Sequence, residues 1–131
     1  MIGIDTNVLV RYMVQDDAKQ AAKATKLIES LTVEQRGFVS LISMVELVWV
    51  FTASYGATRE QVAAAIQTLL ETKEIFVESS ESVWKALHTF NAGKADFADC
   101  LIVQSCATNE CEYVVTFDTK AAKFAGMKLL N

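Results

Sequence analysis

The sequence contains no proline, one histidine and three cysteines among its 131 residues. Without proline the usual markers of turns are missing, so element boundaries have to be read from caps and hydrophobic spacing. The cysteines, Cys100, Cys106 and Cys111, are odd in number and show neither a CxxC spacing nor a matching pair of histidines. This pattern argues against a disulfide framework and against a zinc site, and we expect reduced thiols.

Nothing at the N-terminus looks like an export signal, because no basic region followed by an apolar core and a cleavage site is present. The apolar run over residues 37–58 carries Glu46 near its middle, and a carboxylate there would cost about 2.5 kcal/mol or more inside a membrane. We therefore expect a cytoplasmic protein with no membrane partner. With 52% hydrophobic and 21% charged residues, the chain is predicted to form a single domain over residues 1–131.

The formal net charge of -4 argues against a nucleic-acid surface built from clustered lysine and arginine. Two bound divalent cations would cancel this excess, however, and would leave surface lysines available for phosphate. The charge balance therefore excludes a simple basic binding module but not a metal-dependent enzyme that acts on nucleic acid.

Hydrophobic periodicity predicts strands that alternate with helices along the chain. Gly56 is placed to end one helix, and Thr58 with Gln61 forms a capping-box pattern at the start of the next. The predicted strands cover residues 1–5, 37–41, 75–78, 113–117 and, as an edge strand, 127–131; the predicted helices cover 6–14, 16–31, 43–56, 58–72, 80–93 and 95–109. This alternation favours a mainly parallel sheet with helices on both faces.

Two aspartates follow predicted strands directly. Asp5 ends the first strand, and Asp118 follows "YVVTF", which we expect to be a central strand. Ligands bind at this edge of open α/β sheets, so both positions favour a site. Each aspartate also has a local explanation as a helix or turn cap, and the two roles are compatible.

Three further acids lie within predicted helices. Glu46 has Ile42 and Trp49 on its own face, so we expect this carboxylate to be buried, the alternative being an edge position where it reaches water or an arginine. Asp96 and Asp99 share a face at a helix start and should repel each other by about 0.2 to 0.5 kcal/mol. A cap followed by a first-turn acid would also explain that pair.

A shared site would explain all five acids together. Clustered carboxylates raise one another's pKa unless a cation compensates, and Mg²⁺ prefers oxygen ligands of this kind. A bound Mg²⁺ can activate water for attack on phosphorus and stabilise charge on the phosphate oxygens. The acids therefore point to metal-dependent nuclease chemistry.

The segments "IDTNVLV", "DFADCLI" and "VVTFDTK", together with the isolated Glu46, resemble in order and spacing the four acidic motifs of PIN-domain ribonucleases. The chain as a whole resembles the VapC toxins of VapBC toxin–antitoxin pairs. The resemblance implies a PIN-domain α/β/α sandwich, with a mainly parallel central sheet flanked by helices. It also implies a Mg²⁺- or Mn²⁺-dependent endoribonuclease that cleaves tRNA or rRNA, is inhibited by a cognate VapB-like antitoxin and forms a homodimer.

The resemblance also implies roles for individual residues. The catalytic quartet would be Asp5, Glu46, Asp99 and Asp118, with Asp5, Asp99 and Asp96 as candidate metal ligands. Thr6 would orient Asp5, Asn7 would stabilise the loop, and Thr116 would position a water. Cys100 stands where an alanine is more usual in the family.

Four basic residues near the acidic motifs are candidate contacts to RNA phosphates, with an ordinary solvated surface as the open alternative: Arg11, Lys94, Lys120 and Lys123. Four aromatic residues are expected either to pack in the core or to form a surface that binds a protein partner: Trp49, Phe51, Tyr55 and Trp84.

Other enzyme classes fit less well. A haloacid-dehalogenase-like phosphotransferase needs a second acid where Asn7 stands, and a Ser/His hydrolase would have to use His88. The alternative function is a catalytically silent PIN-fold module that acts through a protein partner.

Overall fold

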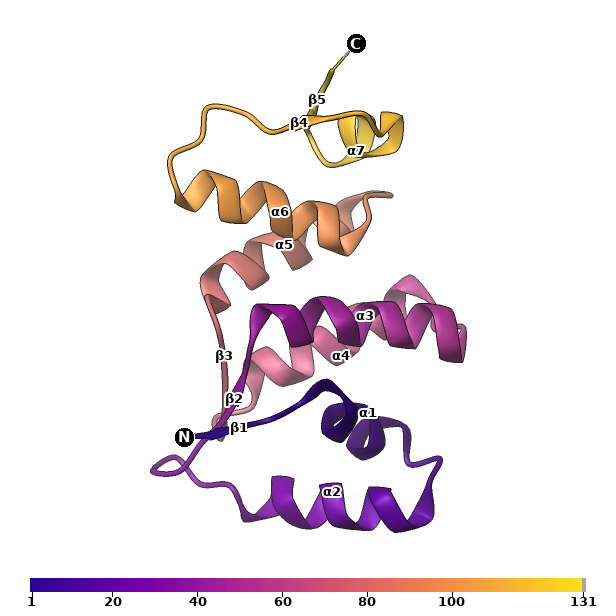
Figure 1. The fold of residues 1–131 in the computed structure, drawn as a ribbon, viewed down its shortest axis with the longest axis vertical. Helices are drawn as coiled ribbons and strands as arrows, with labels where there is room; N and C mark the ends of the chain where they lie inside the picture. The colour runs from indigo at the N-terminus through magenta and orange to yellow at the C-terminus, as the bar shows by residue number, and fades with distance from the viewer. Residues whose placement is uncertain (131) are drawn as a thin grey trace. The chain divides into compact units, whose positions relative to one another are not determined.

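Helices and strands alternate along the chain, as the sequence pattern predicts, and the mixed α/β fold class is confirmed (Figure 1). The computed structural model describes residues 1–130, and Asn131, the last residue of the strand predicted over 127–131, lies outside them. The elements in order are β1 (Ile2–Gly3), α1 (Thr6–Val14), α2 (Ala18–Ser30), β2 (Gly37–Val39), α3 (Leu41–Tyr55), α4 (Arg59–Glu71), β3 (Ile75–Val77), α5 (Ser80–Ala92), α6 (Phe97–Thr108), β4 (Val115–Thr116), α7 (Thr119–Phe124) and β5 (Lys128–Leu129).

The chain divides into two compact units, the first covering Met1–Glu78 and the second beginning at Ser79. Each unit has its own parallel sheet and its own buried side chains. The prediction of one domain over residues 1–131 stays a prediction.

The first unit is built on a three-stranded parallel sheet in the order β1-β2-β3. Gly37 in β2 packs so closely that a Cβ atom there would meet the side chain of Ile4, and would lie 2.9 Å from Cδ1 of Leu31. α1 packs against α2 and α3, and α4 packs against β3. The fully buried side chains of this core include Leu9, Val39, Met44, Leu47 and Ile66.

The ends of the helices in this unit follow local signals. Thr58 accepts from the backbone N–H of Gln61 at 3.1 Å, while the Gln61 side chain accepts from the N–H of Thr58 at 2.9 Å. Gly56 ends α3 in the left-handed region at φ 61°, which favours glycine. The predicted capping box and glycine cap are both present.

The expectation of a buried Glu46 is wrong. α3 buries Ser43, Met44, Leu47 and Phe51, whereas Glu46 is exposed. Ile42 and Trp49, on the same side of the helix, are 74% and 67% exposed. Nearly every position of this helix is apolar, so the pattern did not reveal which face would be covered.

In the second unit, α5 packs against α6. The rings of Phe90 and Phe97 meet edge to face with centroids 5.9 Å apart. Val83, Leu87, Cys100 and Leu101 are buried.

"YVVTF" forms a shorter strand than expected, because only Val115–Thr116 are in strand conformation and β4 pairs only with β5 among the described residues. The prediction of a central strand over 113–117 therefore does not match the strand pairing of the structure. Tyr113, Val115 and Phe117 are 57%, 52% and 80% exposed. Alternating β-branched and aromatic residues favour an extended chain, but they do not determine its pairing partners.

No helix within residues 1–130 combines the length and the apolar character that a membrane span requires.

Candidate functional site

The first unit links two of the predicted acids through Thr6. Asp5 follows β1, and its Oδ1 accepts from the backbone N–H of Thr6 at 2.9 Å at the start of α1. The buried hydroxyl of Thr6, on a residue only 5% exposed, donates to Oε1 of Glu46 at 2.8 Å. Thr6 therefore joins the first acidic motif to Glu46, a residue 40 positions further along the chain. The predicted role of Thr6 in orienting Asp5 stays a prediction; the structure shows that the Thr6 hydroxyl donates to Glu46.

The second unit contains the other three acids. Asp96 caps α6, because its Oδ1 accepts from the N–H of Ala98 at 2.8 Å. Asp118 caps α7, because its Oδ1 accepts from the N–H of Lys120 at 2.8 Å. Asp99 lies in the first turn of α6 and is half-buried.

These three acids interact electrostatically. Burial raises the pKa of Asp99 above its ordinary value, and the charges of Asp96 and then Asp118 raise it further. The Asp99 carboxylate also makes no hydrogen bond or ion pair with any residue from 1 to 130. It is therefore a partly desolvated anion that is not neutralised within the described chain.

The capping aspartates use one oxygen each. For Asp5, Asp96 and Asp118 the capping acceptor is Oδ1, and the part of the chain that the structure describes provides no hydrogen bond to Oδ2. A carboxylate oxygen at a helix start accepts from a backbone N–H that has no partner within the helix. The predicted capping role and the predicted site role are therefore chemically compatible, since one oxygen of each carboxylate stays available.

Within residues 1–130 no group of three or more Asp, Glu, His or Cys side chains is arranged to hold a metal ion, and the assignment of the metal ligands stays a prediction. Asp5 and Glu46 belong to the first unit, and Asp96, Asp99 and Asp118 to the second. The donors do fit a hard divalent cation in their chemistry, because all are carboxylate oxygens. A cation would also offset the repulsion that raises the pKa of Asp99.

Thr116 has a different contact from the one that we expected. Its Oγ1 accepts from the backbone N–H of Asp118 at 3.0 Å. This bond fixes the turn that leads from β4 into the Asp118 cap. The role in positioning a water stays a prediction.

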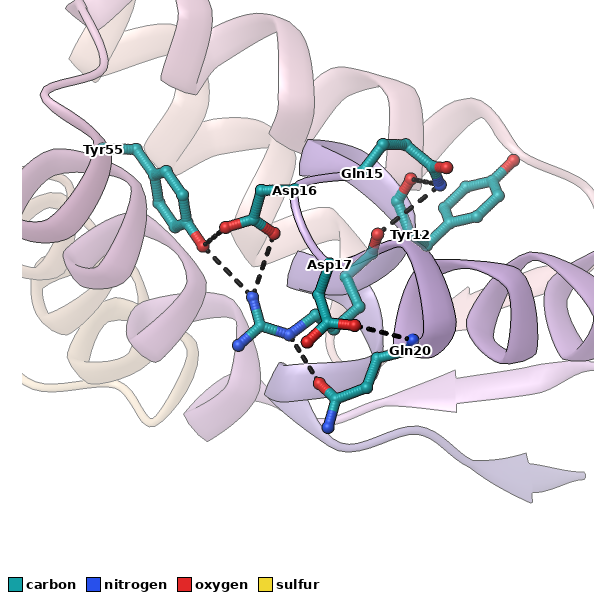
Figure 2. Close-up of polar contacts among 7 residues, drawn as sticks. Tyr12, Gln15, Asp16, Asp17, Gln20 and Tyr55 are labelled. Atoms are coloured by element: carbon teal, nitrogen blue, oxygen red, sulfur yellow. Dashed lines mark hydrogen bonds and ion pairs between the residues drawn. The ribbon is translucent and has the colours of Figure 1, made fainter.

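Arg11, a predicted RNA contact, is engaged within the protein. Its guanidinium donates to Asp16 at 3.1 Å, to the Tyr55 hydroxyl at 3.2 Å and to Gln20 at 2.7 Å. Tyr55 in turn donates to the other oxygen of Asp16 at 2.7 Å (Figure 2). The Tyr55 hydroxyl, and then Arg11, lower the pKa of Asp16. RNA would have to compete with these partners for Arg11.

A groove of about 340 Å³ lies between α1 and α2, and sequence reasoning did not identify it. Its lining includes Asn7, Arg11, Gln20 and Lys23, so Asn7 and Arg11 open onto a shared surface with two residues of α2. The only signal in the sequence was the lysine-rich side of the predicted helix over residues 16–31. The loop role that we predicted for Asn7 stays a prediction.

The remaining predicted contacts are on the surface. Lys94, Lys120 and Lys123 are exposed, and Lys123 lies over the ring of Phe124 at 5.4 Å. Of the predicted aromatic surface, Trp49, Tyr55 and Trp84 are 67%, 40% and 41% exposed, whereas Phe51 is buried at 7% and belongs to the core. His88 is exposed on α5.

Comparison with known families shows that the PIN domain family model matches residues 2–127 of this chain. PIN domains are generally nucleases, and they usually use divalent metal ions. A search of curated proteins found no match to the chain.

Proposed function

The chain belongs to the PIN domain family, and from this premise we propose that it is a Mg²⁺- or Mn²⁺-dependent endoribonuclease, the toxin of a type II toxin–antitoxin pair. The observation that carries the proposal is Asp99. A partly buried carboxylate with two acidic neighbours and no compensating partner within residues 1–130 lowers stability and gives no local structural benefit. Such a position is expected where binding or catalysis needs the charge.

The assignment of roles rests on the order of the acidic motifs along the chain: Asp5, Asp99 and Asp96 would be metal ligands, and Glu46 and Asp118 would be the other catalytic acids. When bound, a divalent ion would neutralise the carboxylates, activate water and stabilise negative charge on the scissile phosphate. The caps fix Asp5 and Asp118 in place before any ligand arrives, because each carboxylate is bonded to backbone N–H groups of its helix. Thr6 limits the rotation of Glu46 in the same way.

The substrate of the proposed enzyme is RNA, held through its phosphates. Lys94 and Lys120 are exposed near Asp96 and Asp118 in the sequence, which supports them as phosphate contacts. Arg11 would contribute after exchanging a bond to Asp16 or Tyr55 for a phosphate oxygen. Of the proposed phosphate contacts, Arg11 would therefore gain the least binding free energy, because it gives up a bond within the protein.

We also propose a VapB-like antitoxin and a second copy of the chain as partners. The first unit has a groove of about 470 Å³ among α1, α3 and α4, lined by Met13, Val14, Phe51 and Tyr55 among others. Trp49 and Ile42 add exposed apolar area on α3. An exposed apolar groove of this kind favours binding of a protein partner, because the partner removes apolar surface from water. Light scattering at high protein concentration tests the dimer, and a strict monomer would contradict it.

The proposed activity is tested by RNA cleavage with the full chain, with Mg²⁺ or Mn²⁺ and with EDTA. Asp5→Asn and Asp99→Asn should each abolish cleavage. The Asp5→Asn change keeps a capping oxygen, because asparagine caps helices as well as aspartate does.

The matched control is Asp17→Asn. Asp17 also caps a helix through Oδ1, accepting from the N–H of Gln20 at 3.0 Å, but it lies outside the acidic motifs. Cleavage should be unchanged in this variant. Cleavage that survives both Asp5→Asn and Asp99→Asn would show that the site is assigned wrongly. RNA or antitoxin binding without cleavage by the native chain would favour the catalytically silent binding module.

A further inference from the structure

Two cysteines that the proposed function does not use lie at the C-terminal end of α6. The backbone N–H of Cys111 donates to the carbonyl of Cys106 at 3.0 Å, and the N–H of Glu110 donates to the carbonyl of Ala107 at 3.0 Å. Glu110 itself is in the left-handed region at φ 62°. Together, these two hydrogen bonds and the left-handed conformation of Glu110 define a Schellman motif at the end of α6.

In a Schellman motif the residue after the left-handed position frequently packs against the residue in the last turn whose carbonyl it bonds. Here these two residues are Cys111 and Cys106, and their side chains are hydrogen-bonded to each other. Cys111 is exposed and Cys106 is half-buried, so small molecules can reach the pair. Burial, and then the neighbouring Cys111 thiol, raise the pKa of Cys106.

The backbone geometry also permits a bond between the two sulfurs. The 3.0 Å hydrogen bond joins the carbonyl oxygen of Cys106 to the backbone nitrogen of Cys111. With standard backbone bond lengths, the Cα atoms of these two residues therefore lie within about 7 Å of each other, which is the upper limit for a disulfide. The third cysteine, Cys100, is buried and only 2% exposed. The motif therefore distinguishes one pair among the three thiols.

We propose that Cys106 and Cys111 form a redox-active dithiol that a small-molecule disulfide, such as glutathione disulfide, converts into an intramolecular disulfide. The exposed Cys111 thiolate attacks one sulfur of glutathione disulfide, breaks its S–S bond and releases one glutathione thiolate. The Cys106 thiolate then attacks the Cys111 sulfur and displaces the second glutathione. The dithiol loses two electrons, glutathione disulfide gains them, and the two thiol protons pass to the released glutathione thiolates.

The new bond would crosslink the last turn of α6 to the start of the connection that leads to β4. It would hold the chain in the conformation that the Schellman motif already gives it. This site does not depend on the proposed nuclease activity, and its test uses no RNA.

The test begins with the reduced, folded full chain incubated with glutathione disulfide. The products are then unfolded, alkylated and weighed by mass spectrometry. The native chain should lose the mass of two hydrogen atoms and take up one alkyl group in place of three, with peptide mapping placing the bond between Cys106 and Cys111. Cys111→Ser and Cys106→Ser should form no internal bond and should take up two alkyl groups, or one alkyl group and one glutathione. Cys100→Ala is the matched control and should form the same bond as the native chain.

A second pair of variants tests the motif itself. Glu110→Gly keeps the left-handed residue and should oxidise at the native rate, whereas Glu110→Val disfavours that conformation and should slow disulfide formation about tenfold. Circular dichroism confirms that both variants are folded. The proposal is overturned if the native chain keeps three alkylatable thiols, ends as glutathione adducts, or forms an internal bond through Cys100. Equal rates for the two Glu110 variants would also overturn it.

Discussion

The hydrogen bond between Thr6 and Glu46 predicts the effect of replacing Thr6 by valine. Valine has nearly the shape of threonine and a similar helix propensity, so Thr6→Val removes the hydroxyl donor while keeping the packing of a residue only 5% exposed. The bond that this change removes joins Oγ1 of Thr6 to Oε1 of Glu46 at 2.8 Å. Bonds to charged groups contribute about 1.5 to 3 kcal/mol, but water can reach the exposed Glu46 carboxylate once the hydroxyl is gone.

The expected loss is therefore below that range, about 1 kcal/mol of unfolding free energy, or a fall of roughly 4 °C in melting temperature. Thermal and urea unfolding, monitored by circular dichroism, measure the changes in melting temperature and in unfolding free energy. If the proposed activity needs Glu46 held in place, the same energy corresponds to about a fivefold fall in kcat. Thr6→Ser keeps the donor and should restore most of both quantities.

A double-mutant cycle with Glu46→Ala isolates the interaction. In the Glu46→Ala background Thr6→Val should have almost no effect on stability, because the acceptor is already gone. An undiminished effect of Thr6→Val in that background would refute the reasoning. Equal stability of Thr6→Val and Thr6→Ser in the native background would refute it as well.

Three further predictions concern other parts of the chain. Because the pKa of Asp99 is raised, the folded protein keeps this proton to a higher pH than the unfolded chain, and the unfolding free energy falls as pH rises from about 4 through the raised pKa. In EDTA, Asp99→Asn should remove that fall and stabilise the protein at pH 7, because it removes a partly buried charge and its repulsion from Asp96, which alone costs about 0.2 to 0.5 kcal/mol; melts across pH measure the change. Gly37→Ala should destabilise by about 1 to 3 kcal/mol because the new Cβ meets Ile4, while Gly3→Ala, with no atom within 4 Å, should cost far less in the same melts. Lys120→Glu should weaken RNA binding and reduce its log–log salt slope by roughly 0.7 for each phosphate that the protein no longer neutralises, and an unchanged slope would remove Lys120 from the proposed surface.

Most elements could be predicted because their signals are local. Asp5, Thr58 and Gly56 each act within a few residues of their own position, and the structure shows all three as caps. Hydrophobic spacing located the buried side of α2, where Ala21 and Ala24 are covered. Local hydrogen bonds and side-chain periods are properties of a short segment, so a single sequence contains them.

The features that could not be predicted depend on distant segments. The sequence shows that residues 41–55 form an apolar helix, but the packing of α1 and α4 determines that Met44 and Leu47, not Glu46, are covered. Likewise, β4 takes β5 as its neighbour through a pairing with residues 128–129 that no pattern within 113–117 encodes. The Thr6–Glu46 bond is of the same kind, because its partners are 40 residues apart.

The acidic residues divide into those with a local structural use and those without one. Asp5, Asp96 and Asp118 each stabilise a helix start through Oδ1, so an aspartate at these positions is explained even without a ligand. Replacing one of them by alanine would remove a cap worth about 1 kcal/mol together with the charge, whereas asparagine removes only the charge. Asp99 has no such use, because its carboxylate caps no helix among residues 1–130, and burial together with the acidic neighbours makes its ionised form less favourable. A residue that lowers stability without supporting local structure is best explained by function, and Asp99 is for this reason the most informative single position in the chain.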